Sequence, residues 1–168
     1  MSLASALPVS TIDDAVIKAM EHVFRTMVGH QIKLVQKIED HGMLVVNDPQ
    51  FIGSVGFVGS ANGLIYLRFP EPYAFLVTSR VLGMSLAEVD MSGPEVVKDA
   101  IGELTNMTVG GFKNQICDLG FPCKLTLPTI VRGNNIAVAA VKSATRHIFH
   151  FETEGQRIIA DLQVKLEA

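Results

Sequence analysis

The sequence predicts an α+β domain built from two successive units, each a long helix followed by three strands. Two segments, 12–28 and 92–118, carry apolar residues at helical spacing. Each is followed by shorter segments that read as strands, several of them alternating apolar and polar residues. A connecting helix at 73–82 separates the two units. The chain therefore has a coarse internal symmetry in its order of elements, although the two halves share little sequence identity.

The first unit begins with the helix over 12–28. Ser10-Thr11-Ile12-Asp13 is typical of a helix N-terminus, and Gly29 is typical of its end. Residues 1–10 are small and apolar, which predicts a loose lead-in. Ser60-Ala61-Asn62-Gly63 is a strong hairpin signal between two of the expected strands. The strands are expected at 32–38, 51–58 and 64–69, with interruptions at His41-Gly42 and Asn47-Asp48-Pro49.

The connection and the start of the second unit carry their own signals. Prolines at 70 and 72 start the helix 73–82, Gly83 ends it, and residues 85–91 are expected to form a loop. Ser92-Gly93-Pro94-Glu95 has the spacing of a capping box, with a proline in the first turn where its missing amide costs nothing.

Three strands are expected after the long helix, at 124–131, 136–151 and 157–166. Pro128 marks the first of these as an edge strand or a bulge. In the last strand one face is apolar, and the other carries Ile159, Asp161, Gln163 and Lys165. We expect that second face to be solvated, as an antiparallel sheet permits.

The helix 92–118 has two distinct sides. Its apolar side carries Val97, Ile101, Leu104, Thr108 and Phe112. The opposite side carries Asp99, Glu103, Asn106 and Gly110, spaced four, three and four apart and therefore stacked in one stripe. Gly102, Gly110 and Gly111 each cost about 1 kcal/mol relative to Ala in a helix interior. Glycines bordering the stripe indicate a surface that something else approaches closely.

Composition limits the function classes. The chain has 168 residues, 48% hydrophobic and 18% charged, which predicts a single domain over 1–168. The net charge is −3 and the basic residues are scattered, so we expect no nucleic-acid binding. No apolar run approaches a membrane span, and the expected location is the cytoplasm, with Cys117 and Cys123 reduced. His147 and His150 lie three apart in an expected strand, so they point to opposite faces and no metal site is expected.

The spacing Asp99-x3-Glu103-x2-Asn106, followed by Pro128, resembles the signature of the CheC/CheX family of chemotaxis phosphatases. The order of elements from residue 11 to the end also fits that family. The resemblance implies two long helices packed on one face of a mostly antiparallel six-stranded sheet. Some members carry the Glu-x2-Asn motif on both long helices, whereas here Glu21 is followed by Phe24 in place of the amide. One active stripe per chain is therefore expected, as in the CheX branch.

The resemblance also implies an activity, hydrolysis of the phosphoaspartate on a phosphorylated CheY-type response regulator. Glu103 would pair with a lysine of the regulator, and Asn106 would hold the attacking water. Asp99, Gly102 and Gly110 would contact the partner. The chain would bind no cofactor itself, because the Mg²⁺ belongs to the regulator's site. The resemblance to CheX-like proteins also implies a homodimer. The strand 136–151 or the terminal strand would then be the edge that extends the sheet across the dimer axis.

Two alternatives remain open at this point. The first is a non-catalytic, regulator-binding or scaffold domain that resembles the flagellar switch proteins. The second is a small-molecule-binding or structural α/β domain, if the motif is coincidental. The presence of both Glu103 and Asn106 favours the phosphatase, because a pure binding surface does not need that pair.

Overall fold

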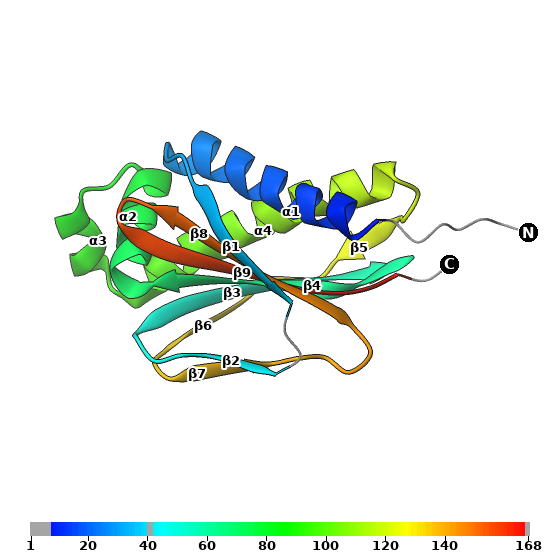
Figure 1. Ribbon diagram of the computed structural model, residues 1–168. Coiled ribbons are helices and arrows are strands. Elements are labelled where there is room, and N and C mark those ends of the chain that lie inside the picture. The colour runs from blue at the N-terminus through cyan, green and yellow to red at the C-terminus, as the bar shows by residue number, and fades with distance from the viewer. Residues whose placement is uncertain (1–7, 40–41, 167–168) are drawn as a thin grey trace, which may run out of the picture.

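Two long helices lie together on one face of a twisted antiparallel sheet in the computed structural model, which describes residues 8–39 and 42–166 (Figure 1). A small two-stranded ribbon lies on the other face of the sheet. Most of the expected lead-in 1–10 and the expected interruption at His41 lie outside the described residues, while residues 9 and 10 already belong to the first helix. The predicted α+β class, with both long helices on one face, is confirmed.

The main sheet has the strand order β1-β8-β9-β4-β3-β5, and β6 also pairs with β3. Its strands are β1 (Lys33–Glu39), β3 (Gln50–Gly59), β4 (Ala61–Pro70), β5 (Cys123–Leu125), β6 (Thr129–Gly133), β8 (Thr145–Thr153) and β9 (Gln156–Leu166). All of these pairs are antiparallel. Each unit places its first strand beside the second strand of the other unit, so the order is symmetric about β4 and β9. An internal duplication of the sequence stays a prediction.

The terminal strand β9 cannot extend the sheet into a second copy, because β8 and β4 already occupy its two sides. The same holds for β8, which lies between β1 and β9. The expected long strand 136–151 is in fact two strands in different sheets. It breaks at a turn over 142–143, where Ser143 adopts a positive φ of 69°. Its first part is β7 (Ile136–Ala139), which pairs with the unpredicted strand β2 (Met43–Val46).

Two buried arginines hold the β2–β7 ribbon against the sheet. Arg68 donates hydrogen bonds to the carbonyl oxygens of Leu44, at 3.0 Å, and Ile136, at 2.6 Å. Arg146 donates to the carbonyl of Val138 at 3.0 Å and forms a bidentate pair with Asp161, at 2.9 and 2.7 Å. Backbone carbonyls on both ribbon strands are thereby tied to guanidinium groups that rise from the sheet.

This ribbon makes one expectation wrong. On the face of β9 that was expected to be solvated, Asp161 and Gln163 are 0% and 1% exposed and Ile159 is buried, whereas Lys165 near the end of the strand is exposed. Gln163 donates to the carbonyl of Ala139 at 3.1 Å, and the amide of Val141 donates to its side-chain oxygen at 2.5 Å. Polar residues alternate along β9 because they serve a buried hydrogen-bond network, not because water reaches them.

The first helix, α1 (Val9–Val23), begins earlier than expected. Its N-cap is Pro8, and no side chain caps it, so the predicted cap at Ser10 is wrong. It continues as a π-helical turn, η1 (Phe24–Val28), to Gly29, whose φ of 77° ends the helix as predicted. The connecting helix α2 (Glu71–Leu82) ends at Gly83 and packs against α4.

The expected loop at 85–91 is a helix, α3 (Leu86–Ser92). Ser85 and Glu88 form its capping box, and the Ser92 hydroxyl donates to the Glu88 carbonyl at 2.7 Å. Ser92 is thus the last residue of α3 and does not cap the next helix. The long helix α4 (Pro94–Asp118) starts at Gly93 with Pro94 in its first turn.

Small residues bring α4 close to its neighbours. A Cβ at Gly53 of β3 would lie 2.2 Å from the Thr105 hydroxyl, so only glycine permits this helix-to-sheet distance. Gln115 donates to the carbonyl of Ala15 in α1 at 3.0 Å. The residues of the predicted apolar side are all buried: Val97, Ile101, Leu104, Thr108 and Phe112. The opposite side of a rigid 25-residue rod is therefore oriented away from the core.

Candidate functional site

Glu103 and Asn106 lie where the sequence places them, on the side of α4 that faces away from the core. Glu103 and Asp99 are exposed, and Asn106 is half-buried. Within residues 8–39 and 42–166, no hydrogen bond or ion pair engages the Glu103 carboxylate or the Asn106 carboxamide. One carboxylate and one carboxamide are thus available to a partner from a helix that cannot bend away.

A bulge in the edge strand brings a second segment alongside this stripe. Phe57 pairs with Leu125 and Ser54 pairs with Thr129, so the two β3 residues between them oppose the three residues 126–128. The predicted edge strand 124–131 is therefore split into β5 and β6 by a bulge that contains Pro128. Bulges of this kind re-aim side chains and are common beside functional sites.

The bulge and α4 together enclose a shallow depression of about 380 Å³. Its lining residues are Lys98, Asp99, Gly102, Glu103, Asn106, Leu127, Pro128 and Ile130. The acidic residue, the Glu, the Asn and the Pro of the sequence motif thus share one site, although Pro128 is distant from the others in the chain. The depression is open to solvent, and its exposed polar groups are suited to complement a site on another macromolecule.

The sequence interpretation missed three residues of this depression. Lys98 pairs with Glu95 at 3.4 Å and is 34% exposed. Leu127 is 87% exposed, and Ile130 is partly buried. Leu127 could have been singled out from its place beside Pro128, because a bulge exposes residues that a regular edge strand would alternate.

The glycines bordering the stripe have neighbours within the protein. Gly102 is buried, and a Cβ there would lie 3.5 Å from Ile130 of β6; it also lines the depression, and its contact with a partner stays a prediction. Gly111 faces Ala19 of α1, and a Cβ at position 111 would lie 3.5 Å from the Ala19 Cβ, an ordinary van der Waals distance. Gly110 is half-buried, and its contact with a partner stays a prediction.

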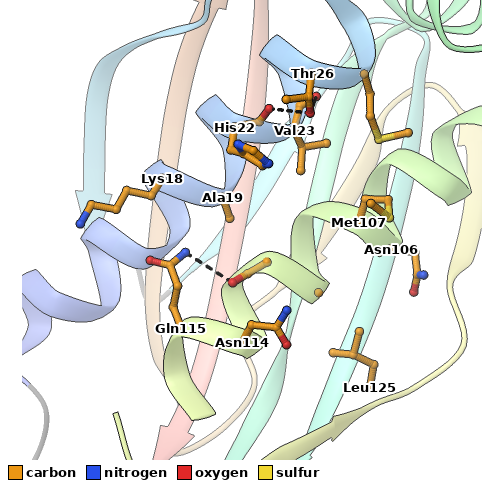
Figure 2. Close-up of a pocket in the computed structure, with 13 residues that line it drawn as sticks. Lys18, Ala19, His22, Val23, Thr26, Asn106, Met107, Asn114, Gln115 and Leu125 are labelled. Atoms are coloured by element: carbon orange, nitrogen blue, oxygen red, sulfur yellow. Dashed lines mark hydrogen bonds between the residues drawn. The ribbon is translucent and has the colours of Figure 1, made fainter. Parts of the chain in front are cut away.

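A second, larger groove of about 560 Å³ runs between α1 and α4 on the other side of Asn106. Figure 2 shows that α1 supplies Lys18 and His22 and η1 supplies Thr26 to one wall, and α4 supplies residues including Met107 and Asn114 to the other. Asn106 lines both this groove and the smaller depression. Its carboxamide therefore stands on the ridge between two hollows.

The first long helix offers no equivalent stripe. Glu21 is exposed, but Phe24 is fully buried, and its ring stacks on Phe69 with centroids 6.1 Å apart. Position 24 therefore belongs to the core. This arrangement supports the expectation of a single active stripe per chain.

Within residues 8–39 and 42–166, no group of three or more His, Cys, Asp and Glu side chains is placed to hold a metal ion. None of the helices there is both long and apolar enough to span a bilayer.

The fold and the site together define a class of protein. It is an α+β domain that presents a carboxylate and a carboxamide from one helix, beside a strand bulge that contains a proline. The profile of the chemotaxis phosphatase CheX family matches residues 51–152, more than half of the chain. The chain therefore belongs to the CheX family.

Individual relatives are consistent with this assignment. The CheY-P phosphatase CheX of Thermotoga maritima is 32% identical over 85 residues, which span 50% of this chain and 52% of the relative, about half of its length. CheX from Desulfovibrio desulfuricans has a similar structure, with a TM-score of 0.80 and 22% identity over 92% of this chain and 99% of that one. A chain of the CheX–CheY–BeF3–Mg²⁺ complex from Borrelia burgdorferi has a TM-score of 0.74 and 21% identity, covering 92% and 97%.

Proposed function

We propose that this protein hydrolyses the phosphoaspartate of a CheY-type response regulator. The observation that carries the proposal is the pairing of Glu103 and Asn106, unengaged and side by side on a rigid helix, next to Pro128. The names of two similar proteins support it, since one is a CheY-P phosphatase and the other was crystallised with CheY.

The chemistry needs few groups from this chain. Water attacks phosphorus as the bond to the aspartyl oxygen breaks, which yields inorganic phosphate and restores the carboxylate. Such transfers depend mainly on positioning and electrostatics. The regulator contributes Mg²⁺ and a lysine near its phosphoryl group, and this chain binds neither.

Each site residue then has one role. Asn106, which stands on the ridge, would enter the regulator's site and orient the water, because a carboxamide both donates and accepts without carrying charge. Glu103, one turn earlier and exposed, would pair with the regulator's lysine. Asp99 would lie at the edge of the interface. Glu103 serves docking and orientation together, so its loss would lower both affinity and rate.

The test is a phosphate-release assay with Mg²⁺ and a panel of CheY-type regulators labelled with acetyl phosphate. Asn106→Ala should lower the catalysed rate by about 10²–10³ while leaving binding largely intact, because the amide acts mainly on the attacking water. Asn114→Ala is the matched control, since it removes an exposed carboxamide about 12 Å further along the same helix. If the wild type binds a regulator yet hydrolyses it no faster than Asn106→Ala does, the chain is a scaffold.

We also propose that the protein is a homodimer. Of the two edges first expected, only β7 remains, because among the described strands it pairs with β2 alone. The outer edge of β7 could pair with its copy across a two-fold axis.

A further inference from the structure

We propose that Leu127 is the apolar anchor that positions the phosphorylated regulator on this site. The inference rests on the proposed function, and it assigns a docking role to a residue outside the family signature. Its basis is the exposure of Leu127, its rigid support and its place in the same depression as Glu103 and Asn106.

Leu127 is one of the most exposed large apolar side chains of the described residues, at 87%. Its neighbour Pro128 has a fixed φ, and Thr129 is paired to Ser54 in the sheet. The side chain therefore projects outward because the bulge aims it there.

The other side of Leu127 is held just as firmly. The amide of Thr126 donates to the Gly56 carbonyl at 2.9 Å, and the Gly56 amide donates back to the Thr126 hydroxyl at 2.9 Å. A Cβ at position 56 would lie 3.1 Å from that hydroxyl, so glycine leaves room for the clamp. Leu127 is thus presented on backbone that is already ordered, and a partner that buries it pays little ordering entropy.

The occupant follows from what surrounds Leu127. A specific interface covers at least about 600 Å² on each partner, so a protein seated over Asn106 must also cover the rest of the depression. Leu127 would then be buried within the contact beside Glu103 and Asn106, with Lys98 and Asp99 forming a charged rim on α4. An apolar centre with a polar rim is the usual composition of such contacts. The partner that Glu103 and Asn106 select is the phosphorylated receiver domain.

The experiment measures steady-state dephosphorylation of a CheY-type regulator and, separately, binding of the same regulator treated with beryllofluoride and Mg²⁺. Leu127→Ala should raise KM and Kd by about tenfold, because most of the buried apolar surface is lost, and should leave kcat within about twofold. Leu127→Met keeps most of the apolar surface and should restore KM to within about threefold.

The matched control is Leu119→Ala. Leu119 directly follows α4, is 44% exposed and lies about 20 Å from Asn106 along the helix axis, so this variant should behave like the wild type in both measurements. Thermal unfolding of the Leu127 variants should coincide with that of the wild type, since Leu127 is largely solvated, and thermal unfolding of Leu119→Ala shows whether that variant is folded when it is assayed.

The outcomes separate this inference from the proposed function. If the wild type dephosphorylates the regulator and Leu127→Ala leaves KM and Kd within twofold, the docking role of Leu127 is refuted and the proposed phosphatase activity is supported. If Leu127→Ala raises the Kd for the beryllofluoride-treated regulator but the wild type does not accelerate hydrolysis, the docking role of Leu127 is supported and the proposed phosphatase activity is refuted. If the wild type binds no regulator of the panel, both are overturned.

Discussion

Replacing Gly53 with alanine should displace α4 from the sheet at the position of the candidate site. The new Cβ would lie 2.2 Å from the Thr105 hydroxyl, 3.0 Å from its Cβ and 3.3 Å from its methyl group. Thr105 cannot simply rotate away, because its own Cβ is too close and its hydroxyl donates to the Ile101 carbonyl at 2.6 Å. Since apolar contacts settle at about 3.5–4.0 Å, the helix must move by about 1 Å.

Two effects of known size follow from this displacement. Overpacking of this kind costs about 1–3 kcal/mol, and we expect a loss near the upper end for a contact with a buried helix. Thr105 lies between Glu103 and Asn106 in the chain, so the stripe moves relative to the bulge at 126–128. A misplacement of about 1 Å can cost about 10² in rate. Gly53→Ala should therefore lower both stability and kcat, although it touches no group of the site.

Urea unfolding and the phosphate-release assay measure the two losses, and the double variant Gly53→Ala/Thr105→Ala supplies the control. Removing the hydroxyl and methyl of Thr105 relieves the two side-chain contacts and leaves only the 3.0 Å approach of the two Cβ atoms. The double variant should thus lose about 1–2 kcal/mol less free energy of unfolding than the sum of the losses in the two single variants. A single variant as stable as the wild type within about 0.5 kcal/mol, or losses that simply add in the double variant, would refute the reasoning.

Two further measurements test other parts of the molecule. Burial, and to a smaller extent the charge of Arg157, lowers the pKa of His150, whose ring nitrogens have no hydrogen-bond partner among the described residues. The unfolded chain therefore binds more protons below about pH 6.5, so stability should fall as the pH drops, and His150→Leu should flatten that slope by up to about 1.4 kcal/mol per pH unit. Urea midpoints between about pH 5 and 7.5 that run parallel for both proteins would contradict this. Light scattering at tens of micromolar should give twice the chain mass of 18.2 kDa, whereas a monomer mass would exclude the dimer.

The parts of the site that the sequence predicts correctly depend on local periodicity. The apolar and polar sides of α4 follow directly from helical spacing, and Pro128 marks the bulge because a proline cannot donate to the ladder. The distance between α4 and the sheet, in contrast, does not follow from local spacing. Nothing local shows that Gly53 accommodates Thr105 or that Gly102 lies under Ile130, because both contacts join segments far apart in the chain.

The errors also have identifiable causes. The chain contains two capping-box patterns seven residues apart, Ser85-x2-Glu88 and Ser92-x2-Glu95, and only the first forms. Ser92 is already the end of α3, where its hydroxyl bonds to the Glu88 carbonyl, so it is not available to cap α4. The exposed-face prediction for β9 failed for another reason. Alternation shows that two faces differ in polarity, but a polar face can contact water or a buried network such as Asp161 and Arg146.

The symmetric strand order raises the question of why α1 is not a second functional helix. In both helices the relevant positions are three apart, which separates them by about 60° around the axis. On α4 that pair straddles the surface, with Glu103 exposed and Asn106 half-buried. On the first long helix the same spacing is rotated inward, so that Glu21 of α1 is exposed while position 24, the first residue of η1, is fully buried against Phe69. An amide at position 24 would lie in the core, away from any partner. The rotation of α1 about its axis, and not only the identity of residue 24, thus confines the proposed chemistry to α4.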